Sequence, residues 1–313
     1  MICGRETLLH VCVFLLYWLL HALCLELFRP FGWVPPIFGL LLRWCGDGFV
    51  ALIAFAVSVR RKRGIYRYTH TFKSFLLPSC LHIIATIAIT YIPFRGWKNA
   101  AEAPALQLSW IILFTTCLVI NFLFYGRQYQ RHKLVALMLM LAGYFVSVVS
   151  DYEAKFLFLE VVLAYVYGVS YGVMLPMIKQ QMETTSLLDA VFLLNFFGFS
   201  VLSFAIPLLL STASWEATSN HKAFSFWTFA ILVPIESLYR VLVLYFISIS
   251  SIEDFFVART WGFFATTLLA TFLYQLDYMI STLKGMVLIL LACIIYMMPP
   301  YKVLKDGTPS IVN

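Results

Sequence analysis

Two pairs of opposite charges lie four residues apart within long apolar segments of this sequence. Arg43 and Asp47 form one pair, and Glu236 and Arg240, just after Pro234, form the other. Four residues make about one helical turn, so the members of each pair can share a helix face and neutralise each other. Alternatively, one member is released to bind a charged solute, with Arg240 meeting an anionic group and Glu236 a cationic one. A charge in an apolar segment is costly, so each of these residues requires one of these two explanations.

Further polar side chains recur at helical spacing in other apolar segments. Glu160, Tyr167 and Tyr171 fall on one face of a predicted helix. The two tyrosines can stack on a solute or hydrogen-bond it, or they can pack within a bundle. His82 can carry a coupling proton, because histidine titrates near physiological pH, or it can be a hydrogen-bonded packing residue. Asn121 can contact a solute or bridge two helices.

No catalytic or metal-binding motif accompanies these residues. The sequence contains no HExxH, GxSxG or P-loop motif, and its 7 cysteines form no CxxC pair or Cys/His cluster. We therefore predict that the protein is not an enzyme and uses no cofactor and no metal ion. Because no loop is long enough for a nucleotide-binding domain, a gradient or an exchange would have to drive any transport.

The composition excludes a water-soluble body that would position these residues. Hydrophobic residues make up 62% of the 313 residues and charged residues only 12%, whereas soluble domains carry about 25% charged residues. This excludes a soluble enzyme, a nucleic-acid-binding module and a disordered protein. The net charge of +7 arises from short basic clusters between apolar runs, which are topology signals rather than a nucleic-acid surface. The predicted solvent is a lipid bilayer.

Ten continuous apolar runs are long enough to cross a bilayer as helices, which need about 20 residues each. Within the sixth, Gly168 and Gly172 form a small-xxx-small pair suited to close helix packing. We predict spans at 8–28, 36–58, 72–93, 105–125, 134–150, 156–178, 187–210, 223–249, 256–275 and 282–302.

The basic residues between the spans predict the orientation. If the N-terminus is cytosolic, cytosolic segments carry about twice as many Lys and Arg residues as the opposite face. We therefore predict a multi-pass membrane protein with both termini in the cytosol. The membrane can be that of the Golgi, the endoplasmic reticulum or the cell surface.

The two halves of the chain echo each other. An offset of about 150 residues aligns Phe122–Leu123 with Phe272–Leu273 and Leu141–Ala142 with Leu291–Ala292. Ten spans divide into two sets of five, and an odd number of spans per half places the second half upside down relative to the first. Inverted repeats of this kind are typical of secondary transporters, whose solute site lies between the halves.

Three segments resemble the drug/metabolite transporter superfamily. Asn121–Gly143, a short basic turn followed by an apolar helix, resembles the junction of its fourth and fifth helices, and Tyr274–Pro299 resembles the junction of its ninth and tenth. Leu163–Leu210 resembles the sixth and seventh helices of its nucleotide-sugar and related solute-carrier branch. The resemblance implies ten helices in inverted five-helix repeats and alternating access for an organic solute.

We therefore predict an all-α integral membrane protein with one membrane domain, built from a first repeat at 1–152 and a second at 153–313. The predicted function is secondary transport of a small organic solute that is nucleotide-sugar-like, thiamine-like or another drug or metabolite. Protons or an exchanged counter-solute would drive it, and a homodimer is an allowed assembly. The alternative is a receptor, scaffold or assembly factor that retains the transporter fold. The predicted solute-binding residues are His82, Asn121, Tyr167, Tyr171, Glu236 and Arg240.

Overall fold

The computed structural model describes most of the apolar runs. The described residues are 12, 36–60, 68–91, 104–149, 158–212, 226–260, 280–298, 301–303 and 309–311.

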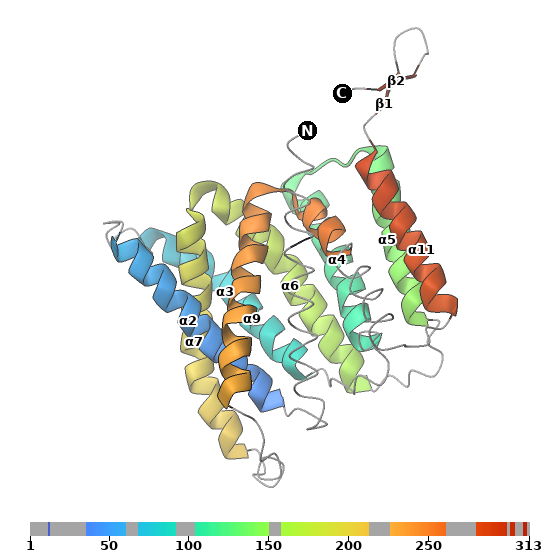
Figure 1. Ribbon diagram of the computed structural model, residues 1–313. Coiled ribbons are helices and arrows are strands. Elements are labelled where there is room, and N and C mark those ends of the chain that lie inside the picture. The colour runs from blue at the N-terminus through green and yellow to red at the C-terminus, as the bar shows by residue number, and fades with distance from the viewer. Residues whose placement is uncertain are drawn as a thin grey trace.

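The described chain is a bundle of helices that lie side by side, with a small hairpin projecting from one end (Figure 1). Residues 252–260 are also helical. The hairpin is antiparallel, pairs Tyr301 with Ile311, and was not expected from the sequence. The labelled elements are α2 (Pro36–Arg60), α3 (Tyr68–Tyr91), α4 (Pro104–Tyr125), α5 (Arg131–Val149), α6 (Phe158–Thr184), α7 (Leu187–Thr212), α9 (Phe226–Ile249), α11 (Ile280–Met297), β1 (Tyr301–Val303) and β2 (Pro309–Ile311).

The described helices follow the predicted spans closely. The first predicted span, 8–28, lies outside the described residues except for Cys12, and so does most of the ninth beyond residue 260. The tenth was predicted to reach residue 302, but α11 ends at Met297. Its end is consistent with the proline pair that follows at 299–300, because a residue before proline is disfavoured in helical conformation.

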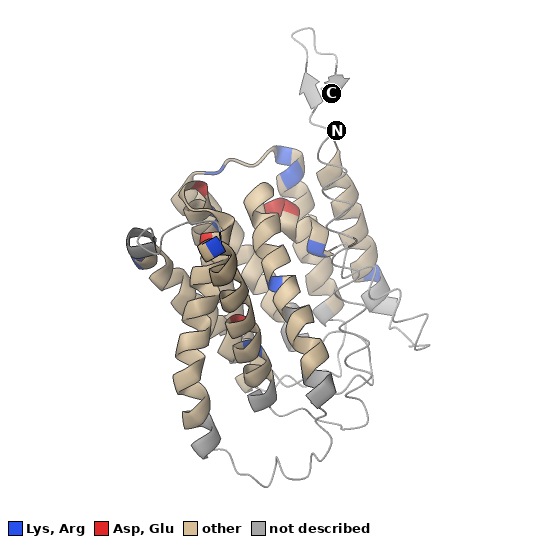
Figure 2. Ribbon diagram, turned by 60° about the vertical axis from the view of Figure 1, so that its left-hand side comes forward, with Lys and Arg blue, Asp and Glu red and all other residues tan. Residues whose placement is uncertain are grey.

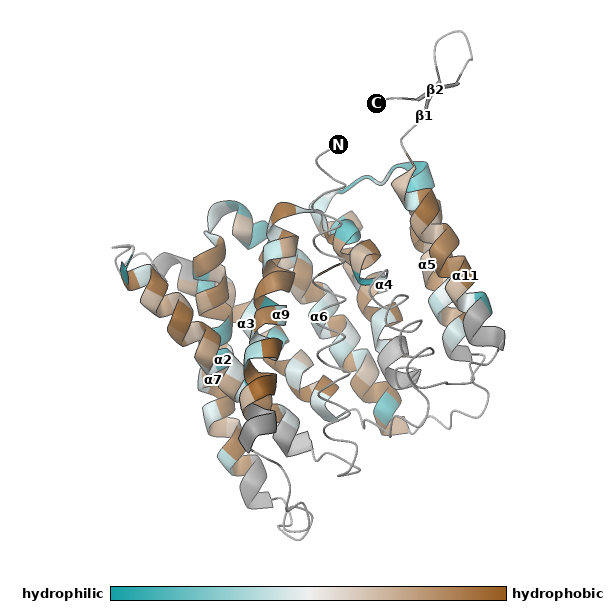
Figure 3. Cartoon of the chain, viewed as in Figure 1, coloured by the Kyte–Doolittle hydropathy of each residue, from teal (hydrophilic) through white to brown (hydrophobic). Residues whose placement is uncertain are grey.

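Six described helices are long and apolar enough to cross a membrane. Less than half of each of their most apolar windows is buried inside the bundle. Outward-facing residues include Phe122, Leu123 and Phe124, which are 60%, 65% and 73% exposed. Between the bundle ends the helices are predominantly apolar (Figure 3), as an outer surface in contact with lipid requires. The six are Gly39–Arg60, Phe72–Tyr91, Leu108–Tyr125, Phe158–Thr184, Leu187–Leu208 and Ala230–Ile249.

Helices distant in sequence form the largest interfaces among the described elements. The four most extensive are those of α5 with α11, α4 with α6, α2 with α7, and α3 with α6. On α2, Trp44 donates to the Ser203 hydroxyl of α7 (2.8 Å), and Phe55 contacts Phe192. Residue numbers rise along α2 as they fall along α7, so these helices run antiparallel.

The α5–α11 interface is also antiparallel and brings two glycines together. A Cβ atom on Gly143 would lie 2.9 Å from the carbonyl oxygen of Gly285. The Lys133 ammonium near the start of α5 lies over the ring of Tyr296 near the end of α11, 4.8 Å from its centroid. The glycines therefore permit backbone-to-backbone packing at this crossing.

Short connections and helix caps gather at one end of the bundle. The turns 126–130, 185–186 and 250–251 all lie there (Figure 1). Ser251 and Asp254 cap the helix at 252–260 reciprocally: each side chain accepts the other's backbone N–H, at 3.1 and 3.3 Å. Figure 2 shows acidic and basic residues at this end, and others part-way along the helices. We call this end the turn end.

Candidate functional site

Aromatic rings from two helices meet in the interior of the bundle. Tyr167 and Tyr171 of α6 stack on each other, with ring centroids 5.6 Å apart and an interplanar angle of 13°. Trp110 of α4 meets the edge of Tyr167 at 6.0 Å. Tyr167 and Trp110 are buried. Helical spacing of four residues places both tyrosines on one face of α6, as predicted.

Two arginines face this aromatic group. The guanidinium carbon of Arg259 lies 3.1 Å from the ring centroid of Trp110, a close cation–π contact. Arg259 also donates to the hydroxyl of Tyr239 on α9 at 2.5 Å. Arg259 and Arg43 of α2 both lie close enough to Tyr167 to interact with it electrostatically.

Together these residues form what we call the central cluster. It draws side chains from α2, α4, α6, α9 and the helix at 252–260. Its members are Arg43, Trp110, Tyr167, Tyr171, Tyr239 and Arg259.

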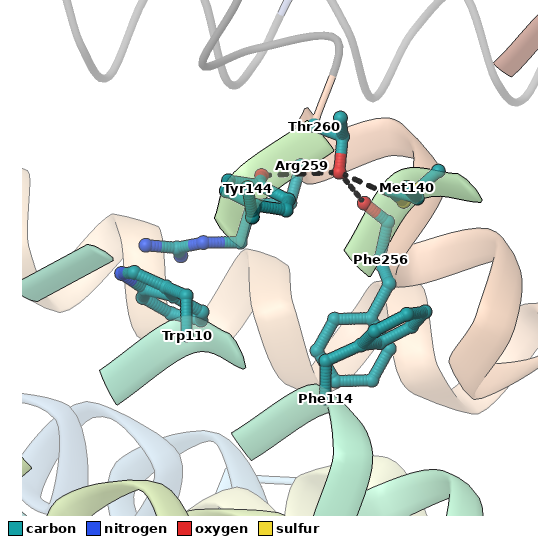
Figure 4. A pocket seen from close by; sticks show the side chains of 7 residues that line it. All are labelled: Trp110, Phe114, Met140, Tyr144, Phe256, Arg259 and Thr260. Atoms are coloured by element: carbon teal, nitrogen blue, oxygen red, sulfur yellow. Dashed lines mark hydrogen bonds between the residues drawn. The ribbon is translucent and has the colours of Figure 1, made fainter. Parts of the chain in front are cut away.

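A hollow borders the central cluster and shares Trp110 and Arg259 with it (Figure 4). On its polar side, Tyr144 of α5 hydrogen-bonds the Thr260 hydroxyl at 3.2 Å, and that hydroxyl also donates to the Phe256 carbonyl at 2.8 Å. The hollow is partly open and its cavity volume is only about 10 Å³, room for about one water molecule and far below the range of about 300–1,000 Å³ usual for drug-sized ligands. The full lining is Trp110, Phe114, Met140, Tyr144, Phe256, Arg259 and Thr260.

His82 of α3 is buried with unsatisfied hydrogen-bonding capacity. Its side chain is 6% exposed, and neither ring nitrogen has a hydrogen-bond partner among the described residues. Arg43 lies close enough to act on it electrostatically, which links His82 to the central cluster. A buried imidazole without partners loses hydrogen bonds it would make in water, so its ring nitrogens are available to a bound water, an ion or a solute.

The ion pair of α2 differs from the sequence prediction. The spacing predicted pairs within single helices, but the Asp47 carboxylate accepts a hydrogen bond from Arg240 of α9, between helices. Both groups are buried, and Gly198 of α7 allows the carboxylate to pack against that helix. The side chain of Glu236 lies outside the described residues. Geometry between helices decides this pairing, and spacing along one helix cannot supply it.

Asn121 lies away from the central cluster, near the turn end. Its amide donates to the carboxylate of Glu253 at 3.4 Å, and Arg127 and Tyr129 donate to the same carboxylate. Asn121 is 3% exposed, so its amide is committed to a buried polar contact between helices. This is the bridging role that the sequence left open as an alternative.

Comparisons with known proteins identify a fold but no family. No family model matches the chain, and no curated protein matches it. Among solved structures, 27 chains match. One of them, described only as "Crystal structure of protein", superimposes with a TM-score of 0.62 and 13% sequence identity, and the match covers 94% of this chain and 96% of that chain. Similarity at this level shows a shared fold over nearly the whole length.

The structure brings together only part of the predicted site. Tyr167 and Tyr171 adjoin each other, and Arg43 is within electrostatic range of both Tyr167 and His82, whereas Arg240 and Asn121 bind elsewhere. Sequence reasoning missed Arg259 and Trp110 of the central cluster. Trp110 and Arg259 lie in two different predicted spans, 105–125 and 256–275, and neither residue type nor spacing predicts that the two side chains meet.

The residue types of the central cluster are suited to binding a solute. Within the described part of the chain, no set of three or more His, Cys, Asp or Glu residues is arranged to hold a metal ion. Guanidinium groups bind carboxylates and phosphates through paired hydrogen bonds, while tyrosine and tryptophan faces accept planar rings. This combination matches a solute with an anionic group and a ring.

Proposed function

We propose that this protein is a secondary transporter with the ten-helix, inverted-repeat architecture of the drug/metabolite transporter superfamily, and that it moves a small organic anion by alternating access. The observation that carries the proposal is the Arg259 guanidinium over Trp110, beside the stacked Tyr167 and Tyr171. Trp110, Tyr167 and Tyr171 lie part-way along α4 and α6, and Trp110 and Tyr167 are buried. A solute site between two repeats is typical of this class of transporter.

The directions of the packed helices support the inverted repeats. Helices α2 and α7 would occupy corresponding places in the two halves, as would α5 and α11. Each pair runs antiparallel, and each pair forms one of the largest interfaces in the described bundle. Helix α4 and its counterpart at 252–260 also run antiparallel, because Asn121 meets Glu253 while Trp110 meets Arg259. Two halves related by an inversion would place corresponding helices in opposite directions.

The charge balance of the cluster favours an anion over a thiamine-like cation. Arg43 and Arg259 both lie within electrostatic range of Tyr167. Two buried acidic groups, Asp47 and Glu253, are engaged outside the cluster: Asp47 pairs with Arg240, and Glu253 accepts from Arg127. A nucleotide-sugar-like solute would fit these donors, with a base ring on the aromatic faces and phosphate oxygens on the guanidinium groups.

His82 completes the proposed site. Its ring nitrogens have no hydrogen-bond partner in the described part of the chain, which makes His82 a candidate both for hydrogen-bonding the solute and for carrying a coupling proton. Transport of the same solute with and without a pH gradient, in His82→Gln and wild-type proteoliposomes, separates the two roles. Loss of pH-gradient coupling with retained solute exchange identifies the proton role, and equal loss of both identifies solute contact.

Ligand-dependent thermal stability of the purified protein tests the solute class. We would compare nucleoside monophosphates, nucleotide sugars and aromatic carboxylates with thiamine and aromatic amines. A solute at 100 times its dissociation constant stabilises a folded protein by about 2.7 kcal/mol, enough to raise the melting temperature measurably. We expect stabilisation by ring-bearing anions, lost in Arg259→Gln and kept in Lys284→Gln, which removes an exposed cation elsewhere.

Stabilisation by the cations alone would contradict the assignment of an anionic solute but not the proposal that the protein is a transporter. The absence of stabilisation by every compound would favour the second candidate, a receptor, scaffold or assembly factor that retains the fold. One observation favours that candidate: the hollow beside Arg259 is smaller than usual ligand pockets. A transporter closed around an empty site would also have a small hollow, so ligand binding is the deciding measurement.

A further inference from the structure

A buried carboxylate joins two helices at the turn end of the bundle. Glu253, only 4% exposed, lies in the first turn of the helix at 252–260. Its carboxylate accepts hydrogen bonds from the Arg127 guanidinium at 3.0 and 3.4 Å, from the Tyr129 hydroxyl at 3.1 Å and from the Asn121 amide at 3.4 Å. Three donors from α4 and the turn after it thus converge on one side chain. We call these four residues the Glu253 latch.

Neighbouring contacts join further helices at the turn end. Tyr296 of α11 donates to the Asp254 carboxylate at 2.9 Å. Lys179 of α6 donates to the carbonyl of Ser248, near the end of α9, at 3.2 Å. Such a cation at a helix end satisfies a carbonyl that has no partner within its own helix. Helices α4, α6, α9, α11 and 252–260 are therefore joined at this one end.

The latch lies along the same pair of helices as the central cluster. On α4, Asn121, Cys117, Phe114 and Trp110 follow one another at helical spacing, from the latch toward the cluster. Phe114 meets Phe256 of the opposite helix at 4.5 Å, between the latch and the Trp110–Arg259 contact. Between the turn end and the central cluster, α4 and the helix at 252–260 are thus held together first by a polar layer and then by an aromatic layer. Separating them from the turn end would open a route to Arg259.

We propose that the Glu253 latch is the gate of the turn end, and that its rupture opens the central cluster to the compartment on that side. The inference rests on the proposed alternating-access function. Burial and the Glu253 carboxylate raise the pKa of Tyr129 far above its ordinary value, so its hydroxyl remains a donor throughout the physiological range. The described conformation is closed at this end.

Cys117 is a native reporter for this gate. Its side chain is fully buried, one helical turn below Asn121 on α4. We would label full-length protein in lipid nanodiscs with a small charged methanethiosulfonate, which reaches both faces. Modification of each cysteine would be followed by peptide mass spectrometry. Cys293 of α11, also buried, reports general loosening of the bundle.

Two variants open the latch, and one variant controls for charge. Glu253→Gln removes the buried charge, and Arg127→Gln removes its partly exposed partner with less risk to folding. Glu183→Gln neutralises an exposed acid at the same end. We expect Cys117 to react at least about 10-fold faster in both latch variants than in wild type or Glu183→Gln, with Cys293 unchanged.

Three results would overturn the gate: an unchanged Cys117 rate in both latch variants, an equal rise in Glu183→Gln, or parallel rises at Cys117 and Cys293 in both latch variants. The labelling requires no solute, so failure of the gate is distinguishable from failure of the proposed transport. If the Cys117 rate is unchanged in both latch variants, ligand stabilisation that depends on Arg259 would still support the proposed transport. If the gate is confirmed but no ligand stabilises the protein, the proposed solute class must be revised.

Discussion

Arg259 makes two contacts that depend on the shape of its guanidinium group. The plane lies over Trp110, and one nitrogen reaches the hydroxyl of Tyr239. Lysine keeps the charge but presents a compact ammonium that cannot cover a ring or form paired hydrogen bonds. Arg259 is therefore a test of geometry as well as of charge.

We expect Arg259→Lys to weaken binding of the stabilising anion about 10-fold, a loss of about 1.4 kcal/mol, by removing paired hydrogen bonds. Isothermal titration with the best anion of the panel measures this loss. Lys284→Arg, at an exposed position of α11, is the matched control. Unaltered affinity in Arg259→Lys would show that charge alone is recognised.

The buried pair between Asp47 and Arg240 has a different role, because it joins α2 to α9. Removing one partner leaves the other charge buried without compensation, which typically costs about 3–5 kcal/mol. We expect Asp47→Asn and Arg240→Gln each to lower the melting temperature in detergent strongly, and the double variant to recover part of the loss. Additive losses in the double variant would contradict a direct pairing.

At the scale of elements, glycines determine how closely α6 approaches α4. A Cβ atom on Gly168 would lie 2.8 Å from the backbone oxygen of Ser109, and one on Gly172 would lie 2.7 Å from that of Leu113. Backbone atoms cannot rotate away as side chains can, so added methyl groups would push the helices apart. The central cluster spans this interface through Trp110.

Gly172→Ala should therefore destabilise the protein by about 1–3 kcal/mol, the usual cost of overpacking. We also expect weaker ligand binding, because Trp110 and Tyr167 would separate. Thermal unfolding and the same titration measure both effects. Val162→Ile adds a methylene to an outward-facing position of α6 and should change neither. A neutral Gly172→Ala would refute the close approach.

Sequence patterns predicted the helices well and the site less well. Apolar runs predicted α4 and α7 to within two residues at each end, because polar or proline residues bound them. The stripe of Tyr167 and Tyr171 and the packing role of Gly168 and Gly172 also follow from helical periodicity alone.

The spacing of residues along the sequence did not predict the contacts between helices. Arg240 pairs with Asp47, 193 positions away, rather than within its own turn. Arg259 meets Trp110 only because two antiparallel helices align. A single sequence specifies which face of a helix is polar, but the partner of that face depends on the packing of the whole bundle.

At the scale of the whole molecule, the turn end carries many of the described basic residues, including Arg127, Arg131 and Lys133. Basic residues favour the cytosolic side of a membrane protein. We therefore expect the turn 126–130 to be cytosolic, together with both termini.

Glycosylation of inserted acceptor sites tests this orientation in any secretory-pathway membrane. The sequence has no N-x-Ser/Thr site of its own, so a single inserted site gives an unambiguous gel shift. We expect modification of a site inserted between residues 213 and 225, which separates α7 from α9, and none after Gln128. The reverse pattern would invert the assigned topology.

The largest interfaces of the described bundle join helices before residue 152 to helices after residue 153: α2 with α7, α3 and α4 with α6, and α5 with α11. A nascent polypeptide cannot form these interfaces until its later spans have been synthesised. The helices of the first half therefore enter the bilayer before their packing partners exist. Two co-expressed fragments, 1–155 and 156–313, should therefore assemble with each other, whereas either fragment alone should be degraded. Pulse-chase labelling would measure both lifetimes, and a long-lived solitary fragment would argue against such mutual dependence.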